Sequence, residues 1–291
     1  MRHISKIERF SRAYIAIGRF DGIHRGHLAL VEKLVAAAQE GEAVSVLVSL
    51  YDPKQEVLTT EEEKAYLLQD SGVDVLLSLE YTDELAGMNY TQLIQDILVP
   101  ELGAVAVVSG DGHIARLEGC GLPMVVCPVV CSQAGEPITR QLLREAFDQA
   151  DMDRFSQLAG HAYVMIGVVV HGAAKGRQVG QPTANLGVAE NKLRPPCGVY
   201  ATISKVDGGV YMGLTNIGRR PSVDDFTYVT IETFILDFDR DIYDKTEVLE
   251  VHFLVRGVMK FRNLQEVRNQ VQKDLQKVRD QLNAIYANYQ E

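Results

Sequence analysis

Residues 13–27 read AYIAIGRFDGIHRGH, in which a short apolar, β-branched run enters a glycine-rich turn. Apolar residues at helical spacing follow directly, at Leu28, Val31, Leu34, Val35 and Ala38. A buried strand, a tight turn and a helix in this order predict the start of a β–α–β unit. The backbone N–H groups at such a helix start form a ready site for phosphate, and ligands of open α/β sheets bind at this edge.

Short apolar strands and amphipathic helices alternate through the rest of the first half. Further strands are expected at Val44–Leu50, Val73–Leu79, Ala104–Val108 and Met124–Val130. Helices are expected at Thr59–Gln69, Tyr90–Leu98 and Ile138–Leu158. Thr60 and Glu63 have the spacing of a capping box. The alternation predicts a Rossmann-like α/β domain with a mostly parallel sheet.

The character of the sequence changes after Gly160. Short β-rich runs follow one another without helices between them, at Tyr163–Val170, Gly198–Lys205, Val210–Asn216, Tyr228–Leu236 and Glu247–Val255. Asp207–Gly208 is a hairpin signal. The spacing predicts a small antiparallel β-barrel or sandwich, and an apolar stripe after Asn263 predicts a terminal helix packed on it. We therefore expect two domains, residues 1–158 and 159–291.

The composition is that of an ordinary globular protein with an acidic balance. The 291 residues include 29 Lys and Arg against 39 Asp and Glu, a net charge of −10. This balance disfavours nucleic acid and anionic membranes as partners. The sequence shows neither a run of about 20 apolar residues that could span a membrane nor a signal peptide, so we expect a cytoplasmic protein. Four cysteines without a CxxC pair are expected to be reduced thiols.

The glycine turn also holds two histidines. His24 and His27 bracket Gly26, so two imidazole donors would lie beside a bound phosphate; the alternative is a plain turn with surface histidines. GRFDGIHRGH resembles the GxFDGxHxGH signature of nucleotidyltransferases, in the form found in bacterial bifunctional riboflavin kinase/FAD synthetases. The resemblance implies that both histidines stabilise the ATP phosphates during adenylyl transfer. It also implies nucleotide binding by the surrounding loop, at Gly18, Phe20, Asp21 and Gly26.

Two later segments of this half match the family only in part. Residues 109–115 read SGDGHIA where the family has GxDFxFG, which keeps Asp111 but replaces both aromatic residues. Residues 138–144 read ITRQLLR where the family has ISSTxIR, which keeps Ile138 and Arg144. The resemblance implies a flavin contact for Asp111 and a nucleotide contact for Arg144. The departures motivate a second hypothesis, in which this half is a nucleotide-binding or regulatory remnant.

A second signature opens the C-terminal half. Residues 167–188 read GVVVHGAAKGRQVGQPTANLGV, which resembles the GxVxxGxxxGRxLGFPTANL segment of the family's riboflavin kinase domain. The resemblance implies that Thr183 and Asn185 help to coordinate Mg²⁺ and ATP, and an oxygen ligand set beside phosphates suits this ion. It implies ATP binding by the glycine-rich loop, at Gly172, Gly176 and Arg177.

Further landmarks follow in the family's order: PCGVY at 196–200, NIGRRPS at 216–222 and IETFILD at 231–237. Glu232 stands in the last of these, where the pattern alone fits an outward-facing strand carboxylate equally well. The resemblance implies that Glu232 is the general base that takes the proton of the ribityl hydroxyl. Arg256 and Lys260–Phe261 match the family's RxxxKF run, which implies a flavin contact for Arg256; a solvated arginine is the alternative.

The leading hypothesis is an enzyme of flavin-cofactor synthesis. Its C-terminal barrel would phosphorylate riboflavin to FMN with Mg²⁺ and ATP, and its N-terminal domain would adenylylate FMN to FAD. The second hypothesis keeps the kinase activity alone. A third, from a different class, is a non-catalytic flavin sensor or carrier.

Overall fold

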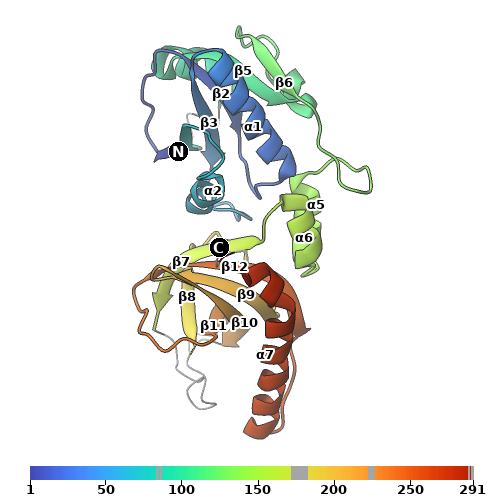
Figure 1. Ribbon diagram of the computed structural model, residues 1–291. Coiled ribbons are helices and arrows are strands. Elements are labelled where there is room, and N and C mark those ends of the chain that lie inside the picture. Colours follow the sequence, from blue (N-terminus) through green and yellow to red (C-terminus); the bar gives the residue numbers. More distant parts are fainter. Residues whose placement is uncertain (83–84, 86, 172–182, 222–226, 288, 290–291) are drawn as a thin grey trace. The chain divides into compact units, whose positions relative to one another are not determined.

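The computed structural model describes every residue except 83–84, 86, 172–182, 222–226, 288 and 290–291. The chain divides into two compact units, Met1–Leu143 and Arg144–Glu291 (Figure 1). The domain boundary expected after Leu158 differs from this division by residues 144–158, and it remains a proposal.

The N-terminal unit is built on a six-stranded parallel sheet in the order β1-β4-β3-β2-β5-β6. Its strands are β1 (Arg2–Ile4), β2 (Ala13–Gly18), β3 (Val44–Tyr51), β4 (Val75–Glu80), β5 (Ala104–Gly110) and β6 (Met124–Cys127). The predicted Rossmann-like sheet is confirmed. Strand β1 was not expected, because its exposed Arg2 and His3 give no apolar pattern. The strand predicted over Met124–Val130 ends early, at Cys127, before a proline that cannot donate to the ladder.

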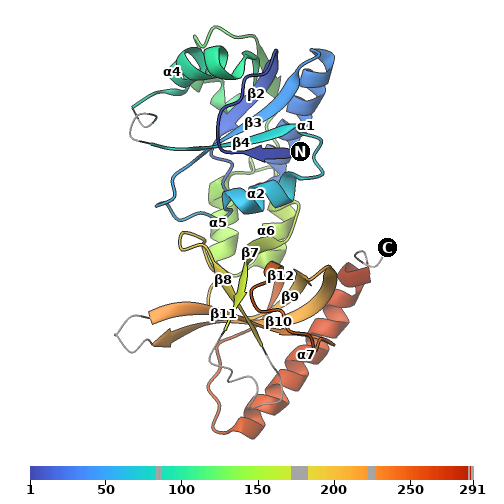
Figure 2. The same cartoon turned by 90° about the vertical axis from the view of Figure 1, so that its left-hand side faces the viewer.

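Helices cover both faces of this sheet (Figures 1 and 2). They are α1 (Arg25–Glu40), α2 (Glu61–Leu68), α4 (Tyr90–Leu93), the π-helical η1 (Ile94–Leu102) and the short 3₁₀ helix η2 (Asp111–Arg116). One core joins Val31 and Leu34 of α1 to the sheet, and the opposite core joins Ile94 and Leu98 of η1 to it. The Thr60–Glu63 capping box is confirmed.

The helix predicted over Ile138–Leu158 is wrong as a single element. The chain forms α5 (Arg140–Asp148) and α6 (Met152–Ala159) instead. Between them Ala150 takes a left-handed conformation (φ 56°), which cannot continue a right-handed helix. Asp151 then caps α6 by accepting the Arg154 N–H at 3.0 Å. The apolar periodicity of the sequence runs through this break, so it predicted one helix where the structure has two.

The C-terminal unit is a closed antiparallel barrel in the order β10-β11-β8-β7-β12-β9 (Figure 2). Its strands are β7 (Tyr163–Val170), β8 (Ala184–Val188), β9 (Gly198–Val206), β10 (Gly209–Pro221), β11 (Thr227–Ile235) and β12 (Thr246–Gly257). Asp207 and Gly208 have φ of 51° and 74° and join β9 to β10 as the expected hairpin. Helix α7 (Leu264–Ala287) packs Val278 and Leu282 against the barrel, which confirms the predicted terminal helix. Within the described part of the chain, no helix has the length and apolarity to span a lipid bilayer.

Candidate active sites

The glycine turn lies at the carboxyl edge of the central strand β2, where Gly18 is the last strand residue. His24 is the N-cap of α1, and its ring Nδ1 accepts the backbone N–H of His27 at 3.2 Å. A ring nitrogen that accepts a hydrogen bond holds no proton, so the neutral His24 ring carries its proton on Nε2. The local fold thus fixes which His24 nitrogen can donate to a ligand.

The two imidazoles form a stacked pair. The His24 and His27 ring centroids are 3.6 Å apart at an interplanar angle of 16°, and the buried Phe20 ring meets His27 edge-on at 5.2 Å. The pair also depends on Gly26, because a Cβ there would lie 3.0 Å from Cε1 of His24. The predicted residues Phe20, His24, Gly26 and His27 are therefore brought together at the helix start.

His27 is held as a neutral imidazole. Burial lowers its pKa well below the usual value, and the neighbouring His24, Lys64 and His113 lower it further. Among the residues that the structure describes, the buried Nδ1 of His27 has no hydrogen-bond partner. The site therefore offers a neutral His27 ring beside the positive end of α1.

Asp21 is engaged within the protein. Its buried carboxylate accepts the backbone N–H of Thr59 at 3.0 Å and forms an ion pair with Arg140 of α5. The Gly22 N–H also bonds Thr59 Oγ1 at 3.1 Å, so the turn is tied to the segment before α2. These contacts give Asp21 a role in shaping the glycine turn.

The two partly matching segments differ in their surroundings. Asp111 opens η2 directly after β5, which neighbours β2, so it stands exposed at the same edge of the sheet as the glycine turn. Arg144 lies on α5 and pairs with Asp148 one turn later, with its Nε 2.7 Å from the carboxylate. Residue 113, within the segment that departs from the family motif, is a histidine whose charge lowers the pKa of His27.

In the barrel, one row of residues crosses three strands. Glu232 of β11 lies opposite Asn185 of β8 on one side and opposite Asn216 of β10 on the other. Directly paired positions point to the same face, and the buried neighbours of each residue show that this row faces away from the barrel interior. The half-buried Glu232 accepts the Thr230 hydroxyl at 3.0 Å. Asn216 was not among the predicted site residues, although it begins the NIGRRPS motif.

The remaining predicted residues of this half are placed as follows. Thr183 immediately precedes β8, and Gly172, Gly176 and Arg177 lie outside the described residues. Arg256 donates from Nε to the buried Asp274 of α7 at 2.8 Å, and its guanidinium lies 5.7 Å from the centre of the Phe261 ring. The side chain of Arg256 therefore already anchors the terminal helix.

The donor chemistry of Asn185 and Glu232 in this row, together with Thr183 just before β8, suits a hard cation. Carboxylate, amide and hydroxyl oxygens at Glu232, Asn185 and Thr183 match the preference of Mg²⁺, which usually keeps few protein ligands beside phosphates. Within the described residues, no cluster of three or more His, Cys, Asp or Glu side chains could hold a metal by itself. The residues fit a metal that arrives with a nucleotide.

Comparisons with known proteins cover both units. A riboflavin kinase family model matches residues 159–282, and an FAD synthetase model matches residues 6–116. The bifunctional riboflavin kinase/FMN adenylyltransferase of Listeria monocytogenes is 30% identical, over 91% of this chain and 91% of its own length. Its counterpart from Bacillus subtilis is 27% identical, over 94% and 93%.

The chain belongs to the bifunctional riboflavin kinase/FMN adenylyltransferase family. The FAD synthetase match contains the stacked histidines, and the riboflavin kinase match contains the Asn185–Glu232–Asn216 row. The fold of this family member also resembles a Streptococcus pneumoniae crystal structure described as a macrolide-efflux protein, with a TM-score of 0.81 at 23% identity over 94% and 95% of the chains. At that identity the likeness concerns the fold alone.

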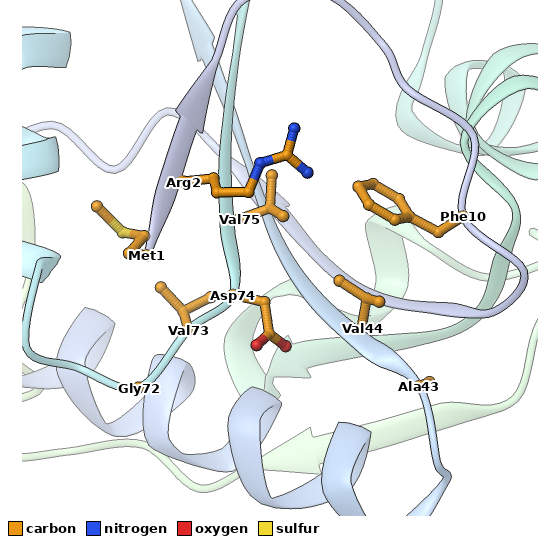
Figure 3. Close-up of a pocket in the computed structure, with 9 residues that line it drawn as sticks. All are labelled: Met1, Arg2, Phe10, Ala43, Val44, Gly72, Val73, Asp74 and Val75. Atoms are coloured by element: carbon orange, nitrogen blue, oxygen red, sulfur yellow. The ribbon is translucent and has the colours of Figure 1, made fainter.

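A shallow pocket of the N-terminal unit lies away from these residues. Figure 3 shows Arg2, Asp74 and Val75 around it, with Val44 at the start of β3, so it opens at the amino ends of the strands. Ligands of open α/β sheets bind at the carboxyl ends. None of the predicted site residues lines this pocket.

Proposed function

We propose that this member of the family makes FAD in two steps, phosphorylation of riboflavin by its barrel and adenylylation of the resulting FMN by its N-terminal unit. The observation that carries the proposal is that each matched part contains its own reactive arrangement. One is the stacked His24–His27 pair at a helix N-terminus, and the other is Glu232 between two asparagines.

In the adenylyl step, an FMN phosphate oxygen attacks the α-phosphorus of ATP, and the bond to the leaving pyrophosphate breaks. Negative charge grows on the α-phosphate oxygens, so donors fixed beforehand stabilise the transition state most. His24 offers Nε2–H to these oxygens, and the N-terminus of α1 adds backbone donors and a favourable dipole. Phe20 keeps the His27 ring in place.

In the kinase step, Glu232 takes the proton of the terminal ribityl hydroxyl as that oxygen attacks the γ-phosphorus, and ADP leaves. Thr183, Asn185 and Asn216 orient the nucleotide through oxygen and amide groups. When bound, Mg²⁺ would neutralise negative charge on the phosphates. The chain itself has a net charge of −10 and supplies no overall positive charge for this.

Separation of the flavin products tests the proposal. The wild-type protein, given riboflavin, ATP and Mg²⁺, should form FMN and then FAD. Glu232→Gln should slow FMN formation by about 10²- to 10⁴-fold, the usual contribution of a general base, while still converting added FMN to FAD. His24→Ala should instead accumulate FMN.

The same assay separates the other hypotheses. The replacement of both family aromatics in residues 109–115 favours a kinase-only protein, which would form FMN and no FAD even with excess ATP. A flavin sensor would form neither product. Unchanged FMN formation in Glu232→Gln would contradict the assignment of the base.

A further inference from the structure

Lys64 is a charged residue in the interior of the N-terminal unit. It lies on α2 and its side chain is only 2% exposed. Its ammonium donates to the Arg19 carbonyl at 2.6 Å, to Ser49 Oγ at 3.0 Å and to the Glu61 carboxylate. Burial of an ammonium is costly unless its donors are satisfied, and all three donors are used here. The three hydrogen bonds hold the ammonium of Lys64 at one position, so we ask what that position does for the neighbouring turn.

The Arg19 carbonyl belongs to the glycine turn itself. The next residue, Phe20, has φ of 48°, a left-handed conformation that is unfavourable for a residue with a side chain. The Phe20 ring is buried and meets the His27 ring edge-on. Lys64 therefore holds the Arg19 carbonyl by a hydrogen bond, directly before Phe20, whose ring contacts His27.

Further polar groups contact Glu61, the partner of Lys64. Glu61 accepts the Ser78 hydroxyl at 2.5 Å, and Ser78 also contacts Nε2 of His3 at 2.9 Å. Gly18, Ser49 and Ser78 lie side by side in register on β2, β3 and β4. The hydrogen bonds link three parallel strands, β1, β3 and β4, to α2 and to the turn that follows β2, so the members have little freedom to shift.

Lys64 also acts on His27 through its charge. The titratable groups whose charge acts on the pKa of His27 are His24 at the helix start, Lys64 on α2 and His113 on η2. Burial is the largest cause of the lowered pKa of His27, and the Lys64 charge adds to it. Loss of that charge would raise the pKa of His27.

We propose that Lys64 is the positioning residue of the adenylyl-transfer loop: its ammonium fixes the Arg19–Phe20 backbone and, through Phe20, the ring of His27. The inference rests on the proposed conversion of FMN to FAD. It assigns to α2 a part in the reaction that the family signatures in this chain do not include.

The test compares Lys64→Met with the double variant Glu61→Gln/Lys64→Met, which also removes the charge of the partly buried Glu61 that pairs with Lys64. Lys33→Met, on the exposed face of α1, is the matched control. We expect both Lys64 variants to lose about 10- to 100-fold in kcat for FAD formation, with a smaller change in KM for ATP, because misplaced groups weaken the transition state most. FMN formation by the same chains should be unchanged.

A second measurement follows His27 directly. In protein carrying ¹³C-labelled histidine, the His27 signal is identified by its loss in His27→Gln, and its titration is recorded by NMR. In folded Lys64→Met the titration should move to higher pH, whereas Lys33→Met should leave it unchanged.

The outcomes are distinguishable. Unchanged kcat for FAD formation together with an unchanged His27 titration in the folded variants would overturn the role of Lys64. If the wild-type protein forms no FAD, the proposed function fails, and the His27 titration alone then decides whether Lys64 acts on this ring.

Discussion

Gly26 leaves little space for a side chain beside His24. A Cβ at this position would lie 3.0 Å from Cε1 and 3.1 Å from Nδ1 of the His24 ring. We predict that Gly26→Ala displaces the ring, breaks the His24 stack with His27 and lowers FAD formation from FMN by about 10- to 100-fold. FMN formation from riboflavin in the same chain is the internal control. Unchanged FAD formation would show that His24 does not need this position.

Glu247 is a second residue whose surroundings matter, because they change the pKa of its carboxyl group. It is fully buried in the barrel, and Ser204 donates to its Oε1 at 2.6 Å. Burial raises the pKa of Glu247, which the Ser204 hydrogen bond opposes. The carboxyl ionises in the unfolded chain before it does so in the folded one. Its contribution to stability is therefore full below about pH 4.5, the usual value for a glutamate, and is lost as pH rises toward the raised folded pKa.

We predict that Glu247→Gln raises the Tm at pH 7 by a few degrees, since a neutral side chain removes this loss. The difference from wild type should shrink at pH 5. Thermal unfolding followed by circular dichroism at both pH values measures it. A lower Tm for the variant at pH 7 would mean that the ionised carboxylate is stabilised by the barrel.

At the scale of elements, α7 is attached to the barrel by polar contacts as well as by its apolar stripe. Asp274 is 3% exposed and accepts from Arg256 at 2.8 Å and from Gln270 at 2.8 Å. Lys277 also donates to the Val255 carbonyl at 2.9 Å. These bonds orient a helix whose outer face is charged.

We predict that Asp274→Ala destabilises the C-terminal unit by about 1–3 kcal/mol, because it leaves the largely buried Arg256 without its carboxylate partner. Asp280→Ala is the control on the same helix, since the exposed Asp280 accepts a hydrogen bond from Gln276 at 2.8 Å within the helix. Denaturant unfolding of both variants gives the comparison. Equal losses for the two would show that the ion pair adds nothing.

At the scale of the molecule, the start of the riboflavin kinase match and the start of the C-terminal compact unit do not coincide. The family match starts at residue 159, whereas the compact unit starts at Arg144. Phe147 and Phe155, on α5 and α6, pack on Tyr163 of β7 with centroid distances of 4.8 and 5.3 Å. Both aromatic rings are buried, so they belong to the core of the C-terminal unit.

We predict that a fragment of residues 144–291 is more stable than one of residues 159–291. Loss of the two rings should cost at least about 3 kcal/mol and lower the Tm by about 10 °C. Thermal unfolding of the purified fragments measures the difference. Equal Tm values would favour the boundary after Leu158 as the physical edge of the domain.

Local patterns determined much of this protein. The apolar periods predicted the parallel sheet, five of the six barrel strands and α7, because burial of one face imposes those periods on the sequence. Strand β8 was hidden within the PTANL motif, being short and only partly apolar. The glycine turn was also local: its strand, its N-cap and His24–His27 all lie within fifteen residues, and the resemblance to the family rested on it.

Tertiary structure alone decided the contacts that make the sites specific. Asn185, Glu232 and Asn216 meet only because three strands pair in one register. Asp21 reaches Arg140 across 119 residues, and Lys64 is buried beneath a turn 45 residues away. Periodicity reports which face of an element is buried, but it holds no information on which distant backbone atom or charge that face will meet.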